Sequence, residues 1–153
     1  MNIVFLDAYN LIYRSLSGFT KGENYVIFNF FRGIRPLVEK YNPDLVYFVL
    51  EGNPKHRAQL SEGAYKSNRK SKGEHFHLQK ASIIQAVKTF LPFTTIRHPD
   101  FECDDVIATL VTKHAKAGDD CFIISSDSDF IQLHNICNMT LYNPVKKKEI
   151  PKP

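Results

Sequence analysis

The stretch Asn2–Leu6, NIVFL, is an asparagine followed by four apolar residues, and it ends directly at Asp7. A second such run, LVYFVL at Leu45–Leu50, ends directly at Glu51. Short, continuous apolar runs rich in β-branched and aromatic residues are typical of strands that are buried on both faces of a parallel sheet. The two runs therefore predict two buried strands, each followed at once by an acid.

Amphipathic segments alternate with further short apolar runs along the rest of the chain. This alternation predicts an α/β domain with a doubly wound, mainly parallel twisted sheet flanked by helices. Residues 51–73 carry many charges and little apolar periodicity, so we expect a loop with short helical pieces there. The other expected elements are helices over Tyr25–Tyr41, His77–Phe90, Asp104–Lys116 with Gly118 as its C-cap, and about Asp129–His134, and strands over Thr94–Arg97, Cys121–Ser125 and Met139–Tyr142.

Length and composition predict one domain, residues 1–153, with enough apolar residues, 43%, for a core of its own. No run approaches the roughly 18 apolar residues of a membrane span, and the N-terminus lacks the basic stretch of a signal peptide. We therefore expect a cytoplasmic protein. Three cysteines, Cys103, Cys121 and Cys137, are an odd number at wide spacing, which favours reduced, partly buried thiols over disulfides or zinc ligands.

Acids recur at the ends of the expected strands. Because the carboxyl ends of parallel strands meet at one edge of a sheet, these acids are expected to converge there. Like charges about 5 Å apart repel by about 1 kcal/mol per pair even in water, so the cluster requires a cation. Carboxylates alone suit a hard cation, Mg²⁺ or Mn²⁺. The seven candidate ligands are Asp7, Glu51, Glu102, Asp104, Asp105, Asp127 and Asp129.

Single members of this set also have a purely structural interpretation. An Asp before a helix is commonly an N-cap, and acids in a first turn complement the helix dipole, which would account for Asp105, Asp127 or Asp129 taken alone. Capping does not explain why so many acids converge. A zinc site is disfavoured, because His75 and His77 stand two residues apart and would point away from each other on a helix.

The segment from Lys55 to Lys72 is strongly basic, with six basic residues against one acid and a local net charge of +5, larger than the +4 of the whole chain. Such runs are often only a solvated surface. This one begins just after Glu51 and includes Tyr65, which favours contact with a phosphodiester backbone. Its basic residues are Lys55, Arg57, Lys66, Arg69, Lys70 and Lys72.

Five motifs in order resemble the 5′-3′ exonuclease and flap endonuclease family of PIN-like nucleases. They are FLDAYNLIYRS with Asp7 and Arg14, FVLEGNPKHR with Glu51, YKSNR with Tyr65, Lys66 and Arg69, ECDD with Glu102, Asp104 and Asp105, and SSDSDFIQL with Asp127 and Asp129. The resemblance implies a PIN-like fold with an arch-like insertion at about residues 55–92. It also implies hydrolysis of DNA at 5′ ends, flaps or single-strand/duplex junctions, in replication or repair in a bacterial or phage-infected cell.

The resemblance also assigns roles to residues. Asp7, Glu51, Glu102 and Asp104 would mainly bind a first divalent ion, Asp127 and Asp129 a second or both, and Asp105 would act through water. Lys66 and Arg69 would stabilise the transition state of a two-metal reaction, and Tyr65 would stack on a base or sugar. The remaining residues expected to contact DNA are Arg14, Lys55, Arg57, Lys70 and Lys72.

Two departures from the family pattern stand out. Glu51 occupies a position where the family usually has the shorter Asp, and the sequence stops at Pro153, before a further Asp pair and the helix-three-turn-helix element that grips duplex DNA. We hypothesise a split nuclease, in which a separate polypeptide supplies that element. The alternatives are a PIN-type ribonuclease, which needs no YKxxR motif, and a catalytically silent DNA-binding subunit. A receiver-like phosphorylation domain would leave the basic segment unexplained.

Overall fold

The computed structural model describes residues 1–52 and 55–153, and for residues 55–72 it describes the backbone alone. A six-stranded sheet with strand order β3-β2-β1-β4-β5-β6 forms its centre. All neighbours are parallel except β6, which pairs antiparallel with β5. The mainly parallel α/β sheet is therefore confirmed. The strands are β1 (Asn2–Asp7), β2 (Leu45–Val49), β3 (Thr94–Ile96), β4 (Asp120–Ile124), β5 (Thr140–Asn143) and β6 (Lys148–Ile150).

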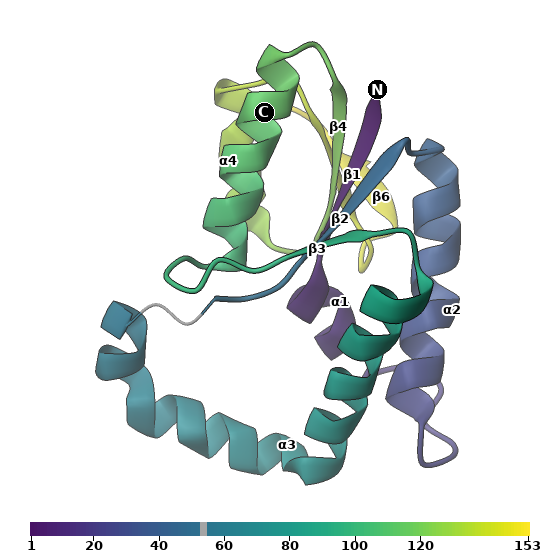
Figure 1. Cartoon of the computed structure of the whole chain (residues 1–153), viewed down its shortest axis with the longest axis vertical. Helices are drawn as coiled ribbons and strands as arrows, with labels where there is room; N and C mark the ends of the chain where they lie inside the picture. The colour runs from purple at the N-terminus through teal and green to yellow at the C-terminus, as the bar shows by residue number, and fades with distance from the viewer. Residues whose placement is uncertain (53–54) are drawn as a thin grey trace.

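Helices cover both faces of the sheet (Figure 1). One face carries α1 (Ala8–Arg14), α2 (Tyr25–Tyr41) and the second part of α3 (Lys55–Phe90), whereas α4 (Cys103–Lys116) and the 3-10 helix η1 (Ser128–Asn135) cover the other. Side chains of β1 alternate between the two cores: Val4 and Leu6 join the first, and Ile3 and Phe5 the second. Because β1 is buried on both sides, its central residues Ile3–Leu6 are all apolar.

The prediction of a loop at residues 51–73 is wrong, because residues 55–73 belong to the long helix α3. The prediction relied on an apolar face, which this region lacks. It does contain good helix formers, including Lys, Arg, Gln, Leu and Ala, with no proline, so the backbone can be helical without a buried stripe. Figure 1 shows α3 strongly bent, and Gly73 inside it has a φ of 77°, which glycine tolerates.

Two short elements were not predicted. Helix α1 follows β1 without a loop, and β6 lies in the lysine-rich segment after Asn143. Both are too short to give a periodic pattern. Most other boundaries agree with the sequence within one or two residues. Gly118, with a φ of 89°, follows the C-cap Ala117, and the amides of Gly118 and Asp119 bond back to the carbonyls of Ala115 and His114 in a Schellman arrangement.

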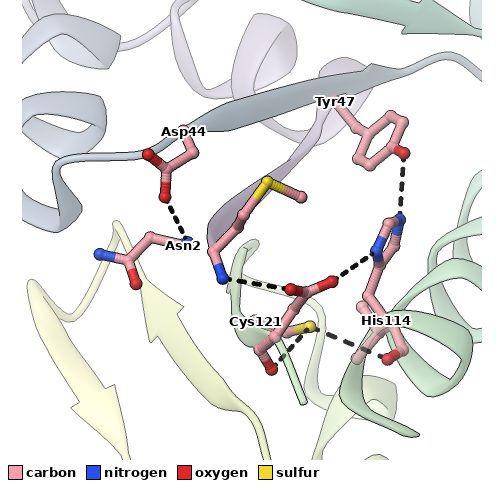
Figure 2. A network of polar contacts seen from close by, with 8 residues as sticks. Asn2, Asp44, Tyr47, His114 and Cys121 are labelled. Carbon is pink, nitrogen blue, oxygen red and sulfur yellow. Dashed lines mark hydrogen bonds and ion pairs between the residues drawn. The ribbon is translucent and has the colours of Figure 1, made fainter. Parts of the chain in front are cut away.

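Polar contacts hold the amino end of β1 between its neighbours (Figure 2). The Met1 amino group donates to Asp119 Oδ1 at 3.1 Å, and His114 Nδ1 lies 3.1 Å from Asp119 Oδ2. The other ring nitrogen of His114 lies 3.0 Å from the Tyr47 hydroxyl. The partners His114 and Met1 lower the pKa of Asp119. This network joins β1, β2 and α4, and it lies at the end of the sheet opposite the clustered acids.

Two expectations from composition can also be compared with the structure. The three cysteines are free thiols; Cys103 and Cys121 are buried and Cys137 is half-buried, as predicted. In the part of the chain that the structure describes, no helix has the length and apolar character needed to cross a bilayer.

Candidate metal centre

Carboxylates from several strand ends gather at the carboxyl edge of the sheet. Glu51, Glu102 and Asp104 form a first group, and Asp104, Asp127 and Asp129 form a second. Within each group, one oxygen of every side chain lies within 4.8 Å of the others. Asp104 belongs to both groups, so the two candidate metal positions are adjacent and share a ligand.

The structure brings together five of the seven predicted acids and places the other two differently. Asp7 lies at the end of β1, only 8% exposed, and belongs to neither group. Its Oδ2 accepts a hydrogen bond from Ser125 Oγ at 2.8 Å, and its Oδ1 lies 3.5 Å from the Cys103 thiol. Asp105 is exposed on α4 and is also outside both groups.

Ser125, Cys103 and Asn10 support the acids and were missed by the sequence reasoning. Ser125 Oγ donates to Asp7 and accepts from the Asp127 backbone N–H at 3.0 Å, so it links acids from the adjacent strands β1 and β4. Asn10 and Ser126 exchange two further hydrogen bonds, of 2.7 and 3.0 Å. The available signal was the polar pair Ser125–Ser126 directly after a buried strand.

Asp127 and Glu51 each cap a helix and also belong to one of the acidic groups. Asp127 accepts from the Asp129 N–H at 2.9 Å and caps η1, as the structural interpretation expects. Helix α4 is capped from a distance, because Glu51 Oε1 accepts from the Cys103 N–H at 3.1 Å. The glutamate at position 51 therefore reaches the N-terminus of α4, where it meets Glu102 and Asp104.

Gly52, just after the end of β2, allows the backbone there to pack closely against the loop before α4. A Cβ atom added at Gly52 would overlap the carbonyl oxygens of His98 and Phe101, so only glycine fits. The close backbone contact places Glu51 beside Glu102, which is the second reason why the first acidic group forms.

Gly52→Ala is expected to destabilise the fold by roughly 1–3 kcal/mol, because backbone atoms rather than a flexible side chain must move. Gly33→Ala, inside helix α2, is the matched control. The added Cβ would lie 3.6 Å from Nη1 of Arg14, which is an ordinary contact, so the change should be neutral or stabilise the helix by up to about 1 kcal/mol. Urea unfolding of both variants measures the difference. Equal stability of the two variants would contradict the close contact at Gly52.

Ionisation of three carboxylates at this edge of the sheet, Asp104, Glu51 and Asp7, is disfavoured by their surroundings. Burial raises the pKa of Asp104, and Glu102, Asp105 and Asp127 raise it further. Burial likewise raises the pKa of Glu51, although the Cys103 N–H opposes the shift. The pKa of Asp7 is raised by burial, against the hydrogen bonds from Ser125 and Cys103. Both groups offer oxygen atoms only, so the residues fit a hard divalent cation such as Mg²⁺ or Mn²⁺.

Asp104→Asn is expected to stabilise the metal-free protein at neutral pH, by about 1 kcal/mol for each carboxylate that no longer faces a like charge. A raised folded-state pKa means that the carboxylate weakens the fold when ionised, and that this effect disappears as pH falls through that pKa. The metal-free variant should therefore exceed the wild type in thermal stability most at about pH 7–8, and this difference should vanish near the ordinary carboxyl pKa of about 4. Equal stability of variant and wild type at neutral pH in EDTA would contradict the repulsion.

The predicted DNA-contacting residues are only partly described. Arg14 ends α1, and its Nη1 atom packs beside Gly33 of α2. The others lie on the first part of α3, where their side chains are outside the described residues, so their roles stay predictions. They are Lys55, Arg57, Tyr65, Lys66, Arg69, Lys70 and Lys72.

Comparison with known proteins gives a consistent result. The profile of a family described as "5'-3' exonuclease, N-terminal resolvase-like domain" matches residues 2–152. DNA polymerase I of Treponema pallidum is 34% identical over 136 residues, and Ribonuclease H of Enterobacteria phage T4 is 32% identical over 108 residues. Among solved structures, a phage T5 5'-exonuclease with bound zinc superposes with a TM-score of 0.77 at 19% identity, over 98% of this chain.

The chain spans only part of the proteins that it matches. The alignments cover 84% and 69% of this chain, but only 14% of the Treponema DNA polymerase I and 32% of the phage T4 Ribonuclease H. Of the phage T5 chain, 58% is covered. A phage T5 flap endonuclease in complex with DNA and metal ions matches with a TM-score of 0.75 at 19% identity, over 97% of this chain and 57% of its own.

Proposed function

Because the chain belongs to the family of 5′-3′ exonuclease N-terminal domains, we propose that it is the catalytic domain of a metal-dependent nuclease. Its substrate would be DNA with a 5′ end, a flap or a single-strand/duplex junction, cut at a phosphodiester bond. The observation that carries this proposal is the pair of acidic groups sharing Asp104. Two adjacent divalent ions are the arrangement that in-line phosphoryl chemistry uses.

The described residues support distinct tasks in that reaction. Glu51, Glu102 and Asp104 would hold one Mg²⁺ or Mn²⁺ ion, and Asp104, Asp127 and Asp129 the other. When bound, such ions act as Lewis acids that stabilise negative charge on the reacting phosphate. Asp7, held by Ser125 and Cys103, would add a negative charge behind the two positions.

Helix α3 supports the second half of the proposal. Within the segment of about residues 55–92, the first part would form the arch that encloses the 5′ strand, with Tyr65, Lys66 and Arg69 near the scissile phosphate. The second part of α3 is anchored in the core through Phe76, Ile83 and Val87. The first part of α3, which carries the basic residues, therefore continues from a helix segment that is packed in place. Cations beside the carboxylates would neutralise charge as it develops on the phosphate.

Cleavage of a 5′-labelled flap DNA with and without Mg²⁺ tests the proposal. We expect cuts at the junction that require the divalent ion. The name of the phage T4 relative, Ribonuclease H, favours RNA as a second candidate substrate, so an RNA flap and an RNA–DNA hybrid belong in the same assay. Cleavage of RNA alone would favour a PIN-type ribonuclease, and metal-independent cleavage would contradict the proposal.

We further propose that a separately encoded helix-three-turn-helix subunit grips the duplex. The chain alone is then expected to cut flaps weakly, and adding the product of a neighbouring open reading frame with that element should restore the rate. Full activity of the isolated chain would contradict this arrangement. If Asp127→Ala left the activity of the restored complex unchanged, the chain would be a silent DNA-binding subunit instead.

A further inference from the structure

Two aromatic side chains face solvent in the loop between β3 and α4. Phe101 is 52% exposed, and its ring centroid lies 4.6 Å from that of the exposed His98. The loop is well fixed: the Asp100 N–H donates to His98 Nδ1 at 3.1 Å, which orients the imidazole. The backbone carbonyl oxygens of His98 and Phe101 both pack closely against Gly52. The pair is therefore a preformed aromatic surface.

This surface lies next to the first acidic group. Phe101 directly precedes Glu102, so their Cα atoms are about 3.8 Å apart across one trans peptide. The contact with Gly52 places the same loop beside Glu51. Any polymer bound with a phosphate at the acidic group would therefore have a flanking unit within reach of Phe101.

A role in capping α4 would explain an apolar side chain at position 101, but not the exposure of the Phe101 ring. Phe101 precedes the N-cap residue Glu102, a position from which an apolar side chain can pack on the fourth helical residue, here Val106. Such a contact would be served equally well by leucine. It does not explain why half of the phenyl ring, which lies tilted by 56° against the His98 imidazole, stays in water.

The charges around the pair select the kind of ligand. Arg97 directly precedes His98, Asp100 lies between the two aromatic residues in the chain, and Glu102 follows Phe101. The two acids nearest Phe101 outnumber this one base, so an anionic group at the Phe101 ring would meet net repulsion. A neutral, flat group that stacks on the exposed Phe101 ring, with the tilted His98 ring at its edge, meets no such repulsion. A nucleobase has this chemistry, and stacking on aromatic side chains tolerates every base.

We propose that Phe101, supported by His98, is a stacking subsite for the nucleobase next to the scissile phosphate. The inference rests on the proposed nuclease function, since it takes the polymer to be a nucleic acid. The proposed subsite adds a base contact on the β3–α4 loop, next to the first acidic group, which contains Glu51 and Glu102.

The chain contains no tryptophan, so Phe101→Trp introduces a unique fluorophore at this surface. A single-stranded DNA oligonucleotide is titrated in Ca²⁺, with labelled-DNA anisotropy reporting saturation and a gel confirming that the DNA stays intact. We expect the tryptophan emission to be quenched in step with binding. Phe90→Trp is the matched control, because Phe90 is 81% exposed at the end of α3, near the amino end of β3, and should not respond.

Affinity of substituted variants separates stacking from capping. Phe101→Leu keeps an apolar side chain before the N-cap but removes the aromatic face, and it should weaken DNA binding by roughly 5- to 150-fold. Phe101→Tyr should bind like the wild type. Saturation without quenching at position 101, or wild-type affinity of Phe101→Leu, would overturn the subsite while leaving flap cleavage by the wild type intact. If the wild-type chain bound no single-stranded DNA at all, both the nuclease proposal and the stacking subsite would be overturned.

Discussion

Asp104→Asn is expected to lower flap cleavage by roughly a thousandfold or more, which corresponds to a barrier increase of about 4 kcal/mol. The physical reason is that Asp104 is the one residue present in both acidic groups. Removing its charge weakens both candidate metal positions at once, whereas the loss of Glu51 or Asp129 would weaken one. The measurement is the single-turnover rate on a 5′-labelled flap, in whichever form, chain or restored complex, is active.

Two controls accompany this prediction. Asp105→Asn removes the same charge from the neighbouring position of α4, but Asp105 is exposed and outside both groups, so its rate should stay within a few-fold of the wild type. The metal-free Asp104→Asn protein should be at least as stable as the wild type, so its inactivity cannot come from unfolding. Equal losses in the Asp104 and Asp105 variants would contradict the assignment of the shared ligand.

Lys66→Ala is expected to reduce turnover by roughly a hundred- to a thousandfold, with a much smaller change in DNA affinity. A cation that meets charge developing on the phosphate acts mainly in the transition state, so its loss lowers the rate constant at saturating DNA. Binding is shared with the other basic residues of the segment Lys55–Lys72 and should persist. Single-turnover rates over a range of DNA concentrations separate the two effects.

Lys88→Ala removes the same charge from the last turn of the same helix. Lys88 is exposed and lies close in sequence to the amino end of β3, at the end of the sheet opposite the acids, and its loss should leave both rate and affinity nearly unchanged. If Lys66→Ala weakened binding and left the saturated rate constant intact, Lys66 would be a backbone contact rather than a catalytic residue.

The sheet and most of the acidic edge could be predicted because their signals are local. A strand that is buried on both faces must be apolar throughout, so Asn2–Leu6 and Leu45–Leu50 were recognisable, and the acids that follow them had to lie at one edge. Five of the seven acids do gather there. The family resemblance, carried by the spacing of the motifs, agrees with the matched family profile.

Other features depend on contacts that no local pattern encodes. The hydrogen bonds that buried Asp7 accepts come from Ser125 and Cys103, which are 118 and 96 residues away in sequence. The close approach at Gly52 depends on the path of a distant loop. The first part of α3 was missed for a different reason: its helix lacks an apolar stripe, and an apolar stripe is the usual signal for a helix.

The placement of divalent ions tests the central claim most directly. Crystals of the chain grown with Mn²⁺ and measured at an anomalous wavelength would locate bound ions independently of any substrate. We predict two sites, one at Glu51, Glu102 and Asp104 and one at Asp104, Asp127 and Asp129, with both weakened or lost in Asp104→Asn. Manganese bound elsewhere with the carboxyl edge of the sheet empty, or bound unchanged in Asp104→Asn, would contradict the account.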